Sequence, residues 1–264
     1  MRSRSGCAGC AASRAARRSA RRVDAAGRAV RTMAECGPAS CCCGGAAPDS
    51  YDYGPQPYVD GSADTFAGVV PRVSTALTSA DRLGELRVRM NLGRDDFRVQ
   101  PGLYALGAPD DTAPVLVTAN YRLSFDAVRA CLAGRDAWLL VLDTRGVNVW
   151  CAAGKGTFGT AELVRRVRDT QLAQVVSHRR LVVPQLGATG VAAHRVRAES
   201  GFAVAWGPVR AADLPAFLDA GMEATAEMRR VRFPLRDRAR LVGVELSVLW
   251  DRRVLIGLAV AAVA

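Results

Sequence analysis

Lysine is nearly absent from this chain of 264 residues: Lys155 is the only one, although lysine and arginine together number 36. Histidine occurs only as His178 and His194, so few side chains could serve as a general base at neutral pH. Aromatic residues make up only 6%. Much of the net charge of +11 comes from residues 1–35, so the rest of the chain is close to neutral. These scarcities argue against nucleic-acid binding.

Long apolar segments are also missing. No apolar stretch follows the arginine-rich start, so no signal peptide is predicted, and a reducing cytoplasm is expected for the cysteines. The last eleven residues, 254–264, are all uncharged and apolar, but a membrane-spanning helix needs about 20. We interpret them as the start of a membrane helix. The eight arginines between residues 229 and 253 then predict the cytoplasmic membrane as the location, with the domain on the cytoplasmic side.

Composition divides the chain into segments. The first segment is rich in Arg, Ala and Cys and has no apolar periodicity, which predicts disorder. In the second, Asp81 is the expected cap of a short amphipathic stretch that ends at Gly93. The predicted divisions are a disordered arm over 1–57, a lead-in segment over 58–100, an α/β domain over 101–240, and the start of a membrane region over 241–264.

From residue 101 onward, short apolar runs alternate with segments of helical periodicity. Strands that are apolar on both faces and alternate with helices are typical of a mostly parallel sheet covered by helices. We therefore predict an α/β, Rossmann-like domain. The predicted strands are 102–107, 113–120, 136–143, 181–186 and 202–207, and the predicted helices are 124–134, 160–170, 190–200 and 211–221.

Unusual residues gather in the loop after the third of these strands. Trp150, Cys151 and Lys155 lie there together with four glycines between 146 and 159. A phosphate-binding loop is disfavoured, because Val149 and Gly156 occupy positions that the motif reserves for Gly and for Ser or Thr. No G-x-G-x-x-G fingerprint follows the first strands, which removes the main support for NAD binding.

Two roles for Cys151 stay open from the residues alone. It could be a nucleophile, with the thiolate favoured by a helix N-terminus and by Lys155, and with His178 or His194 as the base. It could instead be a thiolate ligand of a metal. The other body cysteine, Cys131, lies on the apolar face of a predicted helix and is expected in the core.

The string NVWCAAGK at 148–155 resembles the cap-helix motif of the mercury-methylating corrinoid protein family, HgcA. A weaker similarity reaches the corrinoid subunit of the corrinoid iron-sulfur protein of acetyl-CoA synthesis, which lacks this cysteine. The resemblance continues in blocks, in the same order, at 71–84, 101–107, 114–121, 141–160, 175–194 and 207–233.

The resemblance implies a corrinoid cofactor, a cobalamin-type ring around cobalt, with Cys151 as the lower axial ligand. A thiolate donates electron density strongly, which would favour loss of a methyl carbanion from the opposite face. Thr118 is an expected contact to the corrinoid, although Thr118 and Asn120 could instead cap the helix that begins near Ser124. The other corrinoid-binding residues implied are Asn148, Val149, Trp150, Ala152, Ala153, Gly154 and Lys155.

The function expected from this resemblance is a corrinoid-dependent methyltransferase that moves a methyl group from cobalt to mercury(II), forming methylmercury. The chain lacks a C-x-x-C-x-x-C run, so a small iron-sulfur, ferredoxin-like reductase is the expected partner. The methyl donor implied is the methyl-tetrahydrofolate pathway. The alternatives are a corrinoid methyl carrier of one-carbon and acetyl-CoA metabolism, and a non-catalytic, membrane-tethered module that binds a tetrapyrrole.

Overall fold

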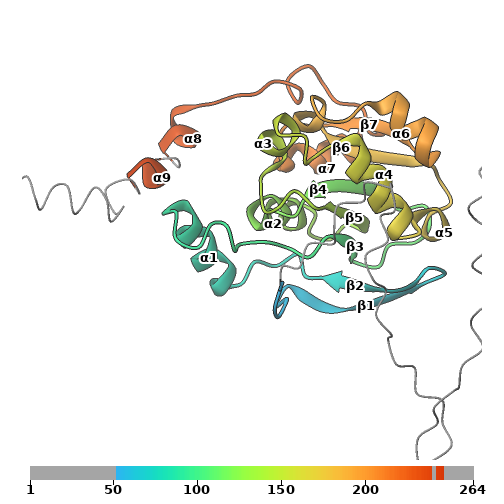
Figure 1. The fold of residues 1–264 in the computed structure, drawn as a ribbon, viewed down its shortest axis with the longest axis horizontal. Coiled ribbons are helices and arrows are strands. Elements are labelled where there is room, and N and C mark those ends of the chain that lie inside the picture. The colour runs from blue at the N-terminus through green and yellow to red at the C-terminus, as the bar shows by residue number, and fades with distance from the viewer. Residues whose placement is uncertain (1–51, 240–241, 247–264) are drawn as a thin grey trace, which may run out of the picture. The chain divides into compact units, whose positions relative to one another are not determined.

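The computed structural model describes residues 52–239 and 242–246 (Figure 1). Their centre is a seven-stranded sheet in the order β1-β2-β3-β5-β4-β6-β7. The α/β architecture predicted from the sequence is confirmed. The strands are β1 (Val59–Thr65), β2 (Gly68–Val73), β3 (Gly102–Leu106), β4 (Val115–Ala119), β5 (Ala137–Leu142), β6 (Arg180–Pro184) and β7 (Ala203–Gly207).

The sheet is mixed, with a parallel half and a partly antiparallel half. Strands β5, β4, β6 and β7 are parallel neighbours, so their carboxyl ends share one edge. Strand β3 pairs antiparallel with β5, and β1 and β2 form an antiparallel hairpin beside it. The hairpin lies in the lead-in segment, where no strand was predicted. Strands β4 and β5 are buried along their whole length, which explains their continuous apolar sequence.

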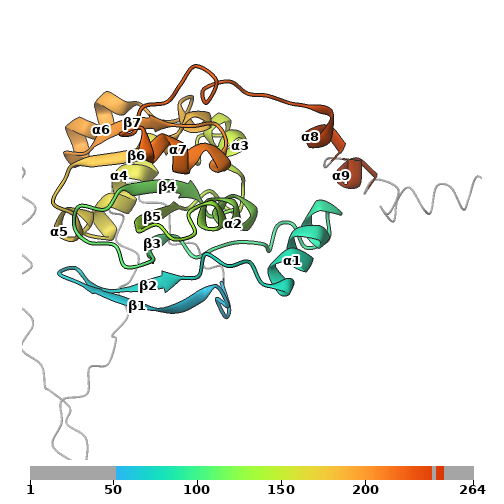
Figure 2. The ribbon, with the colours of Figure 1, turned by 180° about the vertical axis from the view of Figure 1, so that it is seen from behind.

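Helices cover both faces of the sheet (Figures 1 and 2). One face packs against α3, α4, α5 and α6, with Phe158 and Leu163 fully buried between helix and sheet. The other face packs against α2 and α7, where Phe125 and Phe217 are fully buried. The helices are α1 (Ser79–Arg89), α2 (Arg122–Cys131), α3 (Val149–Gly154), α4 (Thr160–Asp169), α5 (Leu172–Val175), α6 (Ala193–Ser200), α7 (Leu214–Asp219), α8 (Leu235–Ala239) and α9 (Val242–Leu246).

A buried ion network ties the lead-in segment to α2. Asp81 accepts hydrogen bonds from Arg122 at 2.7 Å and Arg129 at 2.9 Å. Both arginines also bind Asp126, and Arg129 is fully buried. The expectation that Asp81 caps α1 is corrected here, because Thr78 is the N-cap and Asp81 is the third helical residue of a capping box.

The ends of the chain bear on two further predictions. Most of the arm predicted over 1–57, and the apolar stretch predicted to begin a membrane helix at 254–264, lie outside the described residues. Among the residues that are described, no helix has the length and hydropathy needed to cross a membrane.

Candidate functional site

A cavity of about 310 Å³ lies at the edge of the sheet where the carboxyl ends of β4, β6 and β7 meet. Open α/β sheets bind their ligands at this edge. Strand ends, α2 and the start of α3 form its wall, and most of the lining side chains are apolar. The lining residues are Leu116, Val117, Thr118, Ser124, Val128, Asn148, Val149, Trp150, Val182, Pro184, Leu186, Gly207, Pro208, Val209, Ala211 and Leu214.

Thr118 supplies a polar group to this largely apolar wall. It lies near the end of β4, and only 2% of its surface is exposed to solvent. Its hydroxyl makes no hydrogen bond to any described residue, and it does not cap α2. A threonine hydroxyl can both donate and accept a hydrogen bond, so Thr118, which lines the cavity, can bind a ligand there.

Helix α3 brings the predicted residues Asn148, Val149 and Trp150 to the mouth of the cavity. Asn148 is the N-cap: its Oδ1 accepts a hydrogen bond from the backbone nitrogen of Cys151 at 3.0 Å. The Trp150 side chain stands out at the surface, with 63% of the residue exposed. Cys151 is exposed as well and forms no disulfide. An aromatic ring and a free thiol therefore stand next to each other on one short helix.

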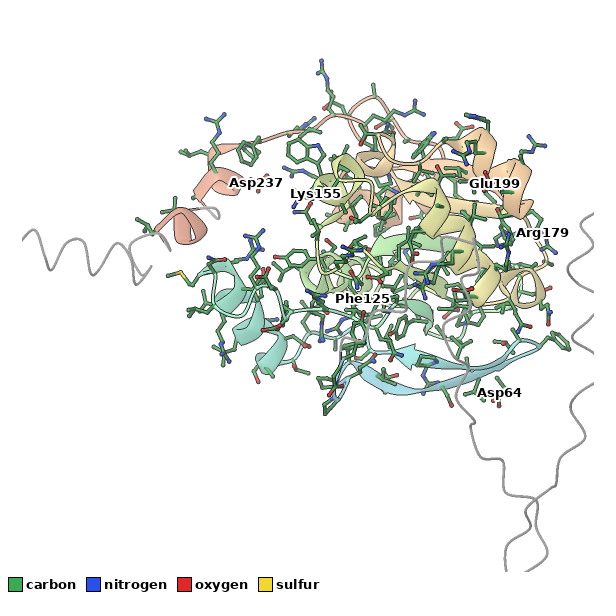
Figure 3. The ribbon with its side chains drawn as sticks, viewed as in Figure 1. Asp64, Phe125, Lys155, Arg179, Glu199 and Asp237 are labelled. Carbon is green, nitrogen blue, oxygen red and sulfur yellow. The ribbon has the colours of Figure 1, made fainter. Side chains whose placement is uncertain are left out.

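The remaining predicted residues of α3 have different surroundings. Ala152 and Ala153 are buried in the hydrophobic core, so their side chains do not line the cavity. Gly154 is exposed, and a Cβ added there would meet no atom within 4 Å. Lys155 is the exposed C-cap of the helix. Figure 3 shows Lys155 and Arg179 at opposite ends of the domain.

Asn120 supports the loop that leads into α3, a role that the sequence did not reveal. Its fully buried side chain accepts hydrogen bonds from Thr144 N at 3.0 Å, Thr144 Oγ1 at 2.8 Å and Gly146 N at 2.9 Å. Its Nδ2 donates to Asp143 at 3.2 Å. Asn120 does not cap α2, whose N-cap is Tyr121. The available signal was a lone amide directly after an apolar strand.

A cysteine-histidine catalytic pair is not assembled. His178 lies just before β6, at the opposite edge of the sheet from α3, where its Nε2 bonds Ala113 O at 2.9 Å and its Nδ1 accepts from Arg180 N at 3.2 Å. His194 is an exposed residue of α6. Cys131 packs against the core, and burial raises the pKa of its thiol to about 11. Cys151 is therefore the accessible thiol in the part of the chain that the structure describes.

A larger cavity, of about 840 Å³, lies at the amino-terminal edge. Its charged side chains are mostly engaged with the protein itself: Arg135 forms a two-pronged ion pair with Asp219, and Arg179 donates to three backbone carbonyls. Of the residues that the sequence analysis singled out, His178 lines it, and both of its ring nitrogens are already hydrogen-bonded to the backbone. Among the described residues, no group of three His, Cys, Asp or Glu side chains could hold a bare metal ion.

Comparison with known proteins identifies relatives of this domain. A family model described as the CO dehydrogenase/acetyl-CoA synthase delta subunit matches residues 76–218, just over half of the chain. The acetyl-CoA decarbonylase/synthase complex subunit gamma of Methanopyrus kandleri is 39% identical over 129 residues, which are 48% of this chain and 27% of the relative. That of Archaeoglobus fulgidus is 32% identical over 128 residues, 48% of this chain and 27% of the relative.

The corrinoid/iron-sulfur protein large subunit of Moorella thermoacetica is 29% identical over 139 residues, which are 51% of this chain and 31% of the relative. The match thus spans about a third or less of each of these relatives. It agrees with the weaker of the two resemblances found in the sequence.

These relatives correct the expected function. The prediction of mercury methylation is wrong, because the matching family and the relatives are subunits of acetyl-CoA complexes and of a corrinoid/iron-sulfur protein. They support the alternative in one-carbon and acetyl-CoA metabolism instead. A mercury(II) substrate and a ferredoxin-like reductase likewise find no support in these comparisons.

Proposed function

The chain belongs to the CO dehydrogenase/acetyl-CoA synthase delta subunit family, and from this premise we propose that it binds a corrinoid and acts as a methyl carrier in one-carbon metabolism. One observation carries the proposal: the cavity at the carboxyl edge of the sheet is lined by the exposed Trp150 of α3, and the next residue of that helix, Cys151, is an exposed free thiol that does not itself line the cavity. The name of one relative, a corrinoid/iron-sulfur protein large subunit, gives the class of cofactor.

The residues present fit such a group. The cavity is lined mainly by apolar side chains, and its volume of about 310 Å³ suits one part of a large cofactor, with the remainder held against the surface. The unpartnered hydroxyl of Thr118 offers a hydrogen bond within it. A corrin ring brings cobalt with four nitrogen ligands of its own, so the protein needs to add at most one ligand and no metal-binding cluster.

In this proposal the residues have distinct roles. Thr118, Asn148 and Val149 contact the part of the corrinoid inside the cavity, and Trp150 covers it from the mouth. Cys151 would supply a thiolate ligand to the cobalt, Gly154 would leave room for the cofactor beside the helix, and Lys155 would bind a polar group at the rim. Ala152 and Ala153 anchor α3 to the core, which fixes where Cys151 lies. The bound corrinoid would supply a cobalt atom that can accept and release a methyl group.

The partners follow from the same premise. The relatives are named as subunits of a complex, so we propose that this domain exchanges methyl groups with other protein subunits. A methyl-tetrahydrofolate-dependent enzyme is the proposed methyl source. The cytoplasmic-membrane location stays a prediction, since the apolar stretch 254–264 on which it depends is not among the described residues.

Titration of the purified full chain with hydroxocobalamin tests the proposal. We expect a saturable change in the visible absorbance of the corrinoid and quenching of tryptophan fluorescence, with most of the quenching lost in Trp150→Phe. Trp206→Phe is the matched control, because Trp206 lies on β7 but does not line the cavity. A chain that leaves the corrinoid spectrum unchanged would overturn the proposal. If the chain binds the corrinoid but, once a strong chemical reductant has supplied the two electrons that take Co(III) to Co(I), takes up no methyl group from a methyl-tetrahydrofolate-dependent enzyme, a non-catalytic binding module would be supported instead.

A further inference from the structure

Asn120 is the point at which the α3 loop is attached to the sheet. The residue directly follows β4, and its backbone nitrogen donates to Leu142 O, the last residue of β5, at 3.0 Å. The neighbouring strand therefore fixes the position of the Asn120 backbone. Its side chain then reaches across to the loop that continues from β5 toward Cys151.

Asn120 acts together with other hydrogen bonds of the loop, from Val147 N to Thr144 O at 3.2 Å and from Arg145 N to Asp143 Oδ1 at 3.0 Å. Arg145 and Gly146 both have positive φ angles, of 57° and 72°, so the chain turns sharply through two left-handed residues in a row. Asn120 Oδ1 binds on both sides of this turn, to Thr144 and to Gly146. The Thr144 hydroxyl lies 2.8 Å from Asn120 Oδ1 and 2.6 Å from Val147 O, and with a single proton it can donate fully to only one of these two acceptors.

The orientation of the Asn120 amide is fixed by its partners. The backbone N–H groups of Thr144 and Gly146 donate to its oxygen, and its nitrogen faces the carboxylate of Asp143. A reversed amide would place N–H groups against N–H groups at the loop and an oxygen against a carboxylate. The side chain at position 120 must thus accept hydrogen bonds from the loop and donate one to Asp143.

We infer that Asn120 is a positioning residue, which sets where Asn148 caps α3 and hence where the Cys151 sulfur is presented to a ligand at the cavity. Asn120 itself does not line the cavity, so it acts through the loop. The inference rests on the proposed function for the identity of that ligand. The geometry of the loop stands without it.

Amide hydrogen exchange in the protein without corrinoid, resolved to single residues, tests whether Asn120 holds the loop and the start of α3. In Asn120→Leu, which keeps a similar volume, the amides of Thr144 and Gly146 lose their acceptor and should exchange at least tenfold faster, as should the Cys151 amide. The double variant Asn120→Asp/Asp143→Asn keeps the acceptor toward Thr144 and Gly146, the hydrogen bond between the two side chains and the net charge, so exchange of the Thr144, Gly146 and Cys151 amides should return to within threefold of the parent, whereas the Arg145 amide loses its acceptor at Asp143 Oδ1. Faster exchange at Thr144 and Gly146 with an unchanged Cys151 amide would overturn the inference.

Corrinoid binding tests whether Asn120 sets where the Cys151 sulfur is presented to the ligand. Loaded Asn120→Leu should still bind hydroxocobalamin, with a dissociation constant raised about tenfold, and its absorbance spectrum should match that of loaded Cys151→Ala. The double variant should regain the parent spectrum. Leu132→Ala, a core change at the C-cap of α2, controls for lost stability and should keep the parent spectrum. A parent spectrum in Asn120→Leu would overturn the inference. Failure of the parent itself to bind corrinoid would refute the proposed function, while the exchange experiment would still decide the role of Asn120.

Discussion

The side chain of Asn148 accepts a hydrogen bond from the backbone nitrogen of Cys151, at 3.0 Å, and so fixes the first turn of the six-residue helix α3. Losing an N-cap typically costs about 1 kcal/mol, and a helix this short has few other bonds to hold it. Asn148→Ala should therefore lower the free energy of unfolding by about 1 kcal/mol. Asn148→Ser should restore most of it. Chemical denaturation measures both. Equal stability of Asn148→Ala and the parent would mean that packing alone holds α3.

The variant Cys151→Ala tests whether Cys151 is a cobalt ligand or only a packing residue. The thiol is exposed, so its removal should change the free energy of unfolding little. If its sulfur reaches cobalt, as proposed, the loaded variant should lose the part of the visible spectrum that depends on thiolate coordination. Cys131→Ala is the control, because Cys131 packs against the core and should affect stability alone. Identical spectra for loaded Cys151→Ala and the loaded parent would show that Cys151 does not coordinate the cobalt.

The two thiols should also differ in reactivity. Burial raises the pKa of Cys131 to about 11, so at pH 8 only about one thiol in a thousand is a thiolate there. Iodoacetamide should label exposed Cys151 far faster. Trypsin cleavage after Arg129, Arg135, Arg145 and Lys155 gives separate peptides, 130–135 and 146–155, so mass spectrometry reads each site alone. Comparable labelling of both peptides would mean that α2 opens readily.

The sequence predicted the positions of β3 to β7 well. Strands β3 to β7 all fall within the predicted apolar runs or within one residue of them, because burial on both faces leaves a continuous apolar signal. The hairpin of β1 and β2 was missed, since β1 alternates between half-buried and exposed residues and Gly61, Gly68 and Pro71 interrupt the pattern. The antiparallel direction of β3 has no periodicity signal at all.

The candidate site was predictable only where rare residues marked it. Trp150, Cys151 and Lys155 stood out by composition, and Thr118 by its place at a strand end. Asn120 did not, because its partners Thr144 and Gly146 lie more than twenty residues away in the chain and come together only when β4 and β5 pair. That pairing could not be read from either segment alone.

The ion network of Asp81 should make stability depend on pH. Burial by itself would raise the pKa of Asp81, but hydrogen bonds from Thr78 and Arg129 outweigh it and hold the pKa below the usual 3.8. A carboxyl group with a depressed folded-state pKa stabilises the fold above its unfolded pKa, and that contribution is lost as the pH falls through the folded value. Asp81→Asn should thus cost about 3 kcal/mol at pH 7, and the difference from the parent should shrink below about pH 4.

Two other acids bear on that measurement. Asp126 shares both arginines, but burial raises its pKa despite them, so its own titration favours the folded state as the pH falls. Asp126 is present in both Asp81→Asn and the parent. Taking the difference between their free energies of unfolding at each pH therefore cancels the contribution of Asp126 to first order. Asp219→Asn, which breaks the exposed pair with Arg135, is the control and should change stability much less. A difference between Asp81→Asn and the parent that stays constant from pH 7 to pH 3 would contradict the assignment to Asp81.

Two glycines near α3 give opposite expectations for the same substitution. A Cβ at Gly154 would meet no atom within 4 Å, and alanine is the better helix former, so Gly154→Ala should stabilise the protein without corrinoid by about 0.5–1 kcal/mol. A Cβ at Gly190 would overlap the carbonyl oxygen of Phe158 and crowd Ala153, so Gly190→Ala should destabilise the protein and displace α3. If the corrinoid covers Gly154 as proposed, the added methyl group should weaken hydroxocobalamin binding while stability rises. A stabilised Gly154→Ala variant with the parent's affinity would place the corrinoid elsewhere on the domain.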